Sequence, residues 1–340
     1  MKRLKFLGAI LIFVILLLKP EGAAQDAQRA MRIWYSSVAP ALFPFLALMP
    51  LLTGEDACRA YEVMFSKWMR PLLRLPGSAA PAIIAGMIAG SPGGAITLRR
   101  VAKNSQLSAS GARRIAFAFG GVSPAFLIIG VGQGLHGSIS VGIKLAVIQV
   151  GVQVLMLLVI PDDDRNEKLA IGDGMQEAKN PIMSAVEGII GVCGYMVFYS
   201  VVAGAISGVL GKGVGNILLP FMDLPSGLAG LAGNASRFKE FVQGTAIGFS
   251  GLCIISQNMN VLRELNIEWK QYILARLASA AMFGISCVAM GSSWNGYMGR
   301  LSDIFSKTYA ISLLIAGIIV IPGIFLFSKN LFLNKYKRGR

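Results

Sequence analysis

The chain has 340 residues, of which 54% are hydrophobic and only 14% are charged, and its mean hydropathy is +0.63. Lys and Arg outnumber Asp and Glu, which gives a formal net charge of +15. Soluble domains usually hold about 25% charged residues. This composition therefore excludes a disordered protein, a disulfide-rich secreted domain and an ordinary cytosolic enzyme. It predicts an all-α polytopic membrane protein.

Uncharged runs of suitable length recur along the whole chain. A helix needs about 20 apolar residues to cross a hydrocarbon core of about 30 Å, and the runs predict about eight transmembrane helices. The first run follows a basic start, and it has two interpretations: a retained helix, which the many later runs favour, and a cleaved signal peptide. The uncharged runs are 6–18, 33–54, 75–98, 115–143, 145–161, 188–211, 224–236, 241–262, 277–299 and 308–328.

Two runs differ from the others in length or composition. Run 75–98 contains three prolines and five glycines, and run 224–236 is too short to span a membrane. Pro and Gly at this density weaken a helix, and broken backbone at membrane depth is tolerated only inside protein or beside an aqueous cavity. We predict two re-entrant hairpins. For the first run the alternative is a kinked ordinary span.

The distribution of Lys and Arg predicts the orientation in the membrane, because cytoplasmic loops collect these residues. Both ends of the chain are basic and are predicted to be cytoplasmic. Basic clusters lie on both sides of run 75–98, so this run is expected to enter and leave from the cytoplasmic face. The loops 162–180 and 263–276 are then inside, while 133–140, the second broken run and 19–32 are outside.

This topology divides the chain into two halves with opposite orientation. Residues 118–123 resemble residues 248–253, and 85–90 resemble 226–230. Inverted repeats with paired broken segments place the binding site of many secondary transporters near the midplane. The predicted regions are an N-terminal helix and connector (1–32), a first half (33–161), an acidic cytoplasmic loop (162–180), a second, inverted half (181–299) and a C-terminal helix with a basic tail (300–340).

Polar and small residues at the breaks are the candidate ligand-binding residues. Exposed backbone groups and half-helix N-termini there would favour a polar or anionic solute. The candidates are Ser91, Pro92, Gly93, Gly94 and Thr97 in the first hairpin, Ser123 and Pro124 in the third span, Ser226, Gly227 and Asn234 in the second hairpin, and Ser256, Gln257 and Asn258 near the end of run 241–262.

The sequence contains no residue pattern that is typical of a metal site or of an enzyme's active site. The four cysteines are scattered and the single histidine, His136, has no catalytic partner nearby, so neither a metal site nor a cofactor nor an enzyme is predicted. Glu187 and Asp223 lie at the edges of apolar segments and are interpreted as surface anchors. The basic pairs at 99–100 and 113–114 are interpreted as contacts to anionic lipid, and nucleic acid is not an expected partner.

Four segments in order carry a family resemblance: 34–45, 70–77, 86–94 and 119–130. They resemble the sporulation integral membrane proteins within the wider nucleoside-recognition (Gate) domain family. The resemblance implies a multi-pass plasma-membrane protein of endospore-forming bacteria that is linked to spore cortex formation. Gate domains also occur in nucleoside and ferrous-iron transport proteins. The chain departs from the family pattern at 119–124 and 228–233, where it lacks polar residues.

The sequence thus predicts a transporter-like protein that moves or senses a small polar solute through a site built by the two hairpins. The alternative is a non-transporting membrane scaffold for cortex-assembly proteins. The expected partners are the lipid bilayer, a small polar or anionic solute, other sporulation membrane proteins and a second copy of the chain.

Overall fold

The structure is a computed structural model that describes residues 2–105, 107–162, 180–229, 231 and 237–290. Every regular element in these ranges is helical, which confirms the predicted all-α fold class. Predictions that concern 163–179, Asn234 and 291–340 lie outside the described residues. The elements up to residue 162 are α1 (Lys2–Leu18), α2 (Pro20–Ile33), η1 (Trp34–Val38), α3 (Ala39–Leu52), α4 (Glu55–Leu73), η2 (Gly77–Ala79), α5 (Ala80–Ile88), α6 (Gly93–Asn104), α7 (Ala109–Ala118), η3 (Phe126–Leu135) and α8 (Ile139–Val159).

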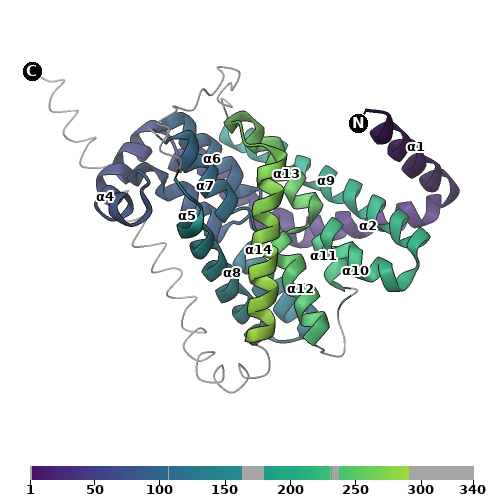
Figure 1. Cartoon of the computed structure of the whole chain (residues 1–340). Helices are drawn as coiled ribbons and strands as arrows, with labels where there is room; N and C mark the ends of the chain where they lie inside the picture. Colours follow the sequence, from purple (N-terminus) through teal and green to yellow (C-terminus); the bar gives the residue numbers. More distant parts are fainter. Residues whose placement is uncertain (1, 106, 163–179, 230, 232–236, 291–340) are drawn as a thin grey trace, which may run out of the picture.

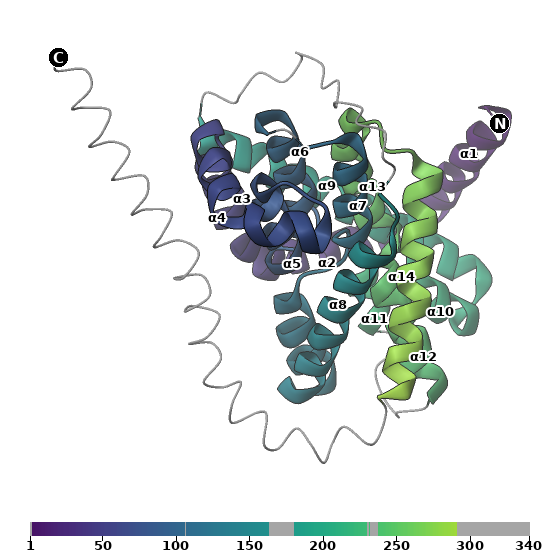
Figure 2. The ribbon, with the colours of Figure 1, turned by 60° about the vertical axis from the view of Figure 1, so that its left-hand side comes forward.

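The second half of the described chain contains fewer helices, and these include the longest, α9. Its elements are α9 (Pro181–Leu210), α10 (Lys212–Met222), α11 (Leu224–Ala229), α12 (Arg237–Phe249), α13 (Gly251–Leu262), η4 (Arg263–Leu265) and α14 (Trp269–Ala289). Figure 1 shows α14 running through the middle of the molecule with α12 beside it, and Figure 2 shows the same pairing from another side. Helices α4 and α1 lie at opposite edges in Figure 1.

Three described helices, α8, α9 and α14, are long and apolar enough to cross a membrane. Two bent helix pairs, Pro20–Val38 with Leu42–Leu52 and Glu55–Leu73 with Gly77–Ile88, would raise the number to five. Many large apolar side chains are exposed on these helices; Phe198 and Ile285, for example, are 58% and 63% exposed. Surfaces of this kind need lipid around them, so the chain is a multi-pass membrane protein.

The third and sixth predicted spans are not continuous helices. The third is interrupted between α7 and η3, where the sequence reads Gly120-Gly-Val-Ser-Pro124, and the sixth between α12 and α13 at Ser250. Glycine adds backbone freedom and proline removes a donor and clashes with the preceding turn, so these residues end the helices where they occur. We refer to residues 119–125 as the first break and to Ser250–Gly251 as the second break.

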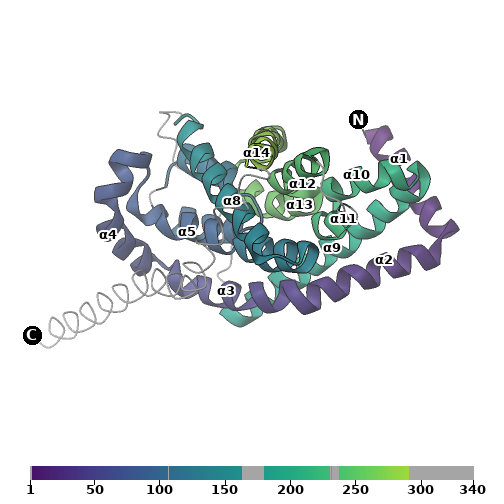
Figure 3. The same ribbon diagram turned by 90° about the horizontal axis from the view of Figure 1, so that it is seen from below.

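A large apolar core joins the two halves, and a smaller one holds the N-terminal helices. The large core includes buried side chains from α5 to α8 and from α11 to α14. The smaller core packs α2 and α3 on α9, where Trp34 Nε1 donates to the Ile189 carbonyl at 3.0 Å. Figure 3 shows α2 along one side of the bundle next to α9.

Loops that were predicted to share the cytoplasmic side meet at one end of the bundle. Arg114 donates to the carbonyls of Leu73, Leu157 and Ile160, and so joins the end of α4 to the end of α8. At the same end, Arg99 pairs with Glu264 at 2.8 Å. Two further contacts join loops at this end: Asn104 Nδ2 to the Thr53 carbonyl, and Ser110 Oγ to Asp162 Oδ1.

The turn at 133–140, which was predicted to lie outside, is at the opposite end. There Gln243 Nε2 donates to His136 Nε2 at 2.7 Å, which joins the start of α12 to the turn before α8. Helix α8 begins at this end and finishes at the basic end, and its 21 residues measure about 30 Å. The described contacts therefore separate the turn at 133–140 from the basic loops, as the Lys and Arg distribution predicts.

Candidate functional site

The first hairpin consists of α5, the turn 89–92 and α6. Gly90 has φ +62°, and the backbones of Gly86 and Gly94 touch across the turn, since a Cβ added at Gly94 would lie 2.7 Å from Gly86 Cα. Because this contact joins residues on either side of the turn, α5 and α6 run antiparallel. Helix α6 also contacts η2, which precedes α5. The hairpin thus enters and leaves at the basic end of the bundle, as predicted.

The turn of the first hairpin packs against the first break. The Ser91 backbone N–H donates to the Gly121 carbonyl at 2.9 Å. A Cβ added at Gly90 would lie 2.5 Å from the Ser123 nitrogen, so the two backbones are in direct contact. Ser123 Oγ accepts from the Phe126 N–H at 3.2 Å and so caps η3. Pro124 lies beside it in the break and is half-buried.

The second hairpin consists of α10 and α11, and its turn is at Asp223. Helices α10 and α11 pack closely side by side, because a Cβ added at Gly227 would overlap the backbone of Leu219 and Pro220. The sequence predicts this hairpin within 224–236. The structure places its turn earlier, since Lys212 and Asp223 mark a short helix rather than a connecting loop.

The second break faces this second hairpin. Ser250 and Gly251 have φ +75° and +74°. A Cβ added at Gly251 would lie 3.3 Å from the Leu224 nitrogen and 3.4 Å from the Met222 carbonyl oxygen. Each hairpin turn therefore contacts the break in the helix that follows it, and the two halves have the same order of elements.

A buried hydrogen-bond network joins the two halves at the first hairpin. Asn258 Nδ2, on α13, lies 2.8 Å from Ser91 Oγ, 2.7 Å from the Tyr272 hydroxyl and 3.3 Å from the Gly120 carbonyl oxygen. Asn258 and Tyr272 are both fully buried. Gly120 has no room for a side chain, because a Cβ there would overlap the Tyr272 hydroxyl. Of the predicted site residues, Ser91 and Asn258 are thus brought together across 167 positions of sequence.

Other predicted site residues use their polar groups locally. Thr97 Oγ1 donates to the Gly93 carbonyl one turn earlier, and Gln257 Nε2 donates to Cys253 Sγ. Ser256 Oγ shares a hydrogen bond with the Tyr199 hydroxyl on α9. Pro92 and Gly93 are buried at the start of α6. These residues shape the site, but their side chains are not directed at the Ser91–Asn258 contact.

Several buried polar residues near the breaks were missed by the sequence analysis. Gln149 and Gln153, four residues apart on α8, are each 2% exposed, and neither polar side-chain atom of Gln153 has a hydrogen-bond partner. A Cβ at Gly121 would overlap the Gln149 amide, so this face of α8 lies against the first break. Their spacing within an uncharged run was the available signal, because positions i and i+4 share one helix face.

Three charged residues were predicted incorrectly: Arg114, Arg276 and Asp223. Arg114, interpreted as a contact to anionic lipid, is 5% exposed and donates to three backbone carbonyls. Arg276 was assigned to a cytoplasmic loop, yet it lies on α14, is 1% exposed and donates to the Phe117 carbonyl at the C-terminal end of α7. Its charge is favourable there because a helix C-terminus is partially negative. Asp223, interpreted as a surface anchor, is also 1% exposed.

The adjacent glycines of α6 are expected to respond differently to substitution. Gly94→Ala should lower stability by about 1–3 kcal/mol, because its Cβ meets the Gly86 backbone, which cannot rotate away. Gly93→Ala should change stability by less than about 1 kcal/mol, since its Cβ would meet only the side chains of Ala89 and Leu42, at 3.2 and 3.4 Å. Thermal unfolding of the purified protein in detergent measures both. Equal losses would contradict the close α5–α6 contact.

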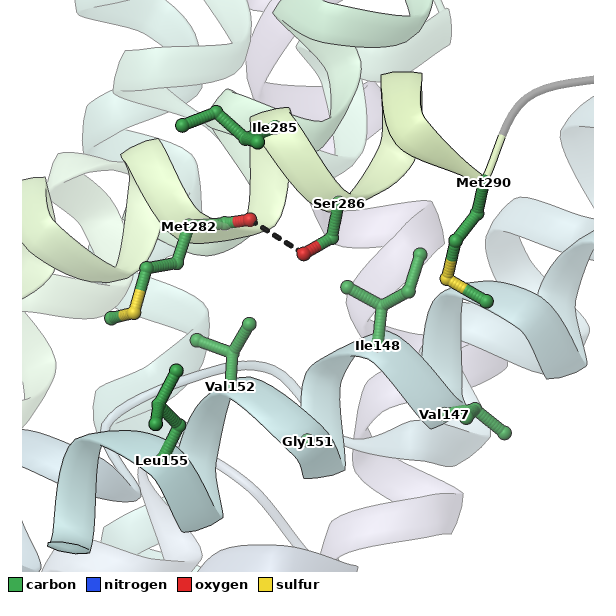
Figure 4. Close-up of a pocket in the computed structure, with 9 residues that line it drawn as sticks. All are labelled: Val147, Ile148, Gly151, Val152, Leu155, Met282, Ile285, Ser286 and Met290. Carbon is green, nitrogen blue, oxygen red and sulfur yellow. Dashed lines mark hydrogen bonds between the residues drawn. The ribbon is translucent and has the colours of Figure 1, made fainter.

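A separate groove of about 420 Å³ lies between α8 and α14 (Figure 4). The one hydroxyl in its lining, Ser286 Oγ, donates to the Met282 carbonyl within α14. The groove therefore lacks free polar groups that could hold the predicted solute. Its lining residues are Val147, Ile148, Gly151, Val152, Leu155, Met282, Ile285, Ser286 and Met290.

Apolar outer faces, two helical hairpins and two broken helices define an α-helical integral membrane protein of the multi-pass class. The chain is 25% identical to the "Sporulation integral membrane protein YlbJ" of Bacillus subtilis (strain 168), over 305 residues that cover 76% of this chain and 75% of that protein. This similarity bears out the resemblance to sporulation integral membrane proteins. No protein-family model matches the chain, and no solved structure matches it.

Proposed function

We propose that this protein moves a small polar solute across the plasma membrane during endospore formation, through a site between the two hairpins and the two breaks. The pairing of each hairpin turn with a helix break carries the proposal. Irregular backbone in a membrane protein is tolerated where it is buried in protein or lines a water-filled path. The sporulation role is supported by the name of the similar Bacillus subtilis protein.

The polar groups at the breaks favour a polar solute. Asn258 Oδ1 is buried without a partner among the described residues, next to the Ser91 contact. Helices α6 and α13 both begin at a turn or break, and helix N-termini carry partial positive charge. A solute with hydroxyl, carbonyl or anionic groups would satisfy these donors and acceptors. The Gate resemblance, which includes nucleoside transport proteins, agrees with such a solute.

Flux into proteoliposomes tests the proposal. Radiolabelled uridine and inorganic phosphate are offered to vesicles that contain the full-length protein, and uptake above empty vesicles is expected for at least one of them. Ser91→Trp should reduce this uptake at least tenfold, because the indole would fill the space between the turn and α13. Asn260→Ala, at an exposed position of α13, is the matched control and should retain uptake.

Uptake that is absent for both solutes, or equal in the wild type and Ser91→Trp, would contradict transport by this route. Thermal unfolding of each variant in detergent shows whether a loss of uptake comes from a loss of folding. The variant Ser91→Ala, which removes only the hydroxyl, provides a second and milder test.

The second candidate function is a membrane scaffold for other sporulation proteins. Helix α4 favours it, because Arg59, Lys67, Trp68 and Arg70 are all exposed on this helix. Arg59 and Arg70 pair with Glu55 and Glu62 of the same helix, so this surface has mixed charge beside an exposed aromatic ring, and such a surface can bind a protein partner. Spore yield separates the two functions: a scaffold predicts a loss in Arg59→Glu/Lys67→Glu and normal yield in Ser91→Trp, whereas transport predicts the reverse.

A further inference from the structure

The turn of the second hairpin contains a buried carboxylate that lacks a hydrogen-bond partner on one oxygen. Asp223 is 1% exposed, and its Oδ1 has no partner among the described residues. The backbone N–H and the hydroxyl of Ser226, three residues along in α11, are the hydrogen-bonding groups beside this carboxylate, and neither carries a charge. A buried carboxylate oxygen without a partner is unusual, because buried polar atoms nearly always form hydrogen bonds. Ionisable residues inside membrane proteins generally mark ion or proton pathways.

The helices around Asp223 supply no positive charge to compensate it. Helix α13 and η3 contain no charged residue, and the titratable group that faces Asp223 from α13 is Cys253. The charged residues of α12 are Arg237, Lys239 and Glu240, in its first turn, about 15 Å along the helix from the second break.

The charged residues of α9 and α10 also lie far from the Asp223 carboxylate. Gly215 of α10 contacts Ser207 of α9, so α10 runs back along α9 and Asp223 lies near the level of residue 200. Glu187, the charged residue of α9, is then about 20 Å away along that helix. Lys212 is the first residue of α10, at the end away from Asp223.

We propose that Asp223 and Ser226 bind a small cation, either a proton or Na⁺, at the turn of the second hairpin. An ionised carboxylate that is buried without a counter-charge costs several kcal/mol, and a bound proton or Na⁺ removes that charge. Ser226 Oγ can accept from the protonated acid or coordinate the metal ion. The Pro220 and Met222 carbonyl oxygens, each 3.4 Å from the position of a Cβ on Gly251, lie at the same turn.

The location gives the cation a role in the transport cycle. Asp223 lies at the contact between the second hairpin and the second break, so a bound cation would stabilise the closed contact and its release would favour opening. This role rests on the proposed transport function, whereas cation binding itself does not.

Thermal unfolding of the purified full-length protein in detergent tests binding without any transported solute. One series compares NaCl with N-methyl-D-glucamine chloride at equal ionic strength and fixed pH, and a second lowers the pH without Na⁺. A ligand that binds only the folded state raises the melting temperature. We expect a rise of several degrees with Na⁺ if the cation is Na⁺, or with falling pH if it is the proton.

Asp223→Asn should abolish this response and should be at least as stable as the saturated wild type, because the amide is a neutral isostere of the compensated carboxylate. Glu187→Gln, an exposed carboxylate on α9, is the matched control and should keep the wild-type response. If Asp223→Asn does not fold, Ser226→Ala replaces it, with an expected loss of about tenfold in Na⁺ affinity or a shifted pH midpoint. A wild type that responds to neither cation, or variants with an unchanged response, would overturn the site. Absence of solute uptake with an intact cation response would overturn the transport proposal alone.

Discussion

Gly90→Ala is expected to destabilise the protein by roughly 3–5 kcal/mol, the largest effect of any single methyl group considered for the site. Gly90 has φ +62°, which alone costs an alanine about 1–2 kcal/mol. The added Cβ would also lie 2.5 Å from the Ser123 nitrogen and 2.7 Å from the Val122 carbonyl carbon. These are backbone atoms of the first break, so the hairpin turn and the break would have to separate.

Gly137→Ala separates the two causes of this loss. Gly137 has φ +61°, nearly the same as Gly90, but a Cβ there would meet nothing within 4 Å. The Gly137→Ala variant should therefore lose only about 1–2 kcal/mol of stability. Chemical or thermal unfolding in detergent measures both variants. If Gly90→Ala loses no more than Gly137→Ala, the turn does not pack against the break as described.

Asn258→Leu should lower stability by about 2–4 kcal/mol and should also loosen the first hairpin. The substitution leaves the buried Tyr272 hydroxyl and the part-buried Ser91 hydroxyl without their shared donor, and a buried unsatisfied group costs about 1–3 kcal/mol. Asn260→Ala, two residues along α13 and exposed, should be nearly neutral and controls for changes in helix propensity. Unfolding in detergent gives the loss, and protease cleavage near the turn reports its loosening.

A double-mutant cycle shows whether the network acts as a unit. Tyr272→Phe removes one partner of Asn258 and leaves the ring in place. If the network couples the residues, the double variant Asn258→Leu/Tyr272→Phe should lose about 1 kcal/mol less than the sum of the two single losses. Strict additivity would mean that the Asn258–Tyr272 hydrogen bond contributes little.

The first hairpin could be predicted from sequence because its signals are local. Gly90 and Pro92 break the helix, and basic residues on both sides reveal that the chain returns to the same end of the bundle. The second hairpin was misplaced for the same reason. Lys212 and Asp223 enclose a short apolar stretch, and a charged residue at the turn was taken as a sign of solvent exposure.

The candidate site could likewise be predicted only in part. Ser91 and Asn258 could be selected as polar residues in apolar surroundings, but their contact depends on how the halves pack, which no local pattern encodes. Gln153 and Arg276 were passed over because each looked ordinary in its own segment. Their burial results from neighbours on other helices, α7 in the case of Arg276. Gly94 and Thr97 lie in the first hairpin, where they contact its own backbone.

The bond between Ser91 and Asn258 also sets an order of assembly during synthesis. When the first half has entered the membrane, Ser91 and the Gly120 carbonyl still lack the amide that comes 167 residues after Ser91. Domains generally form as the chain emerges, N-terminal parts first, but here the earlier half holds an unfinished polar surface until α13 arrives. A chain that stops before α13 would therefore expose this surface, and quality-control proteases of the membrane could distinguish it from the finished protein.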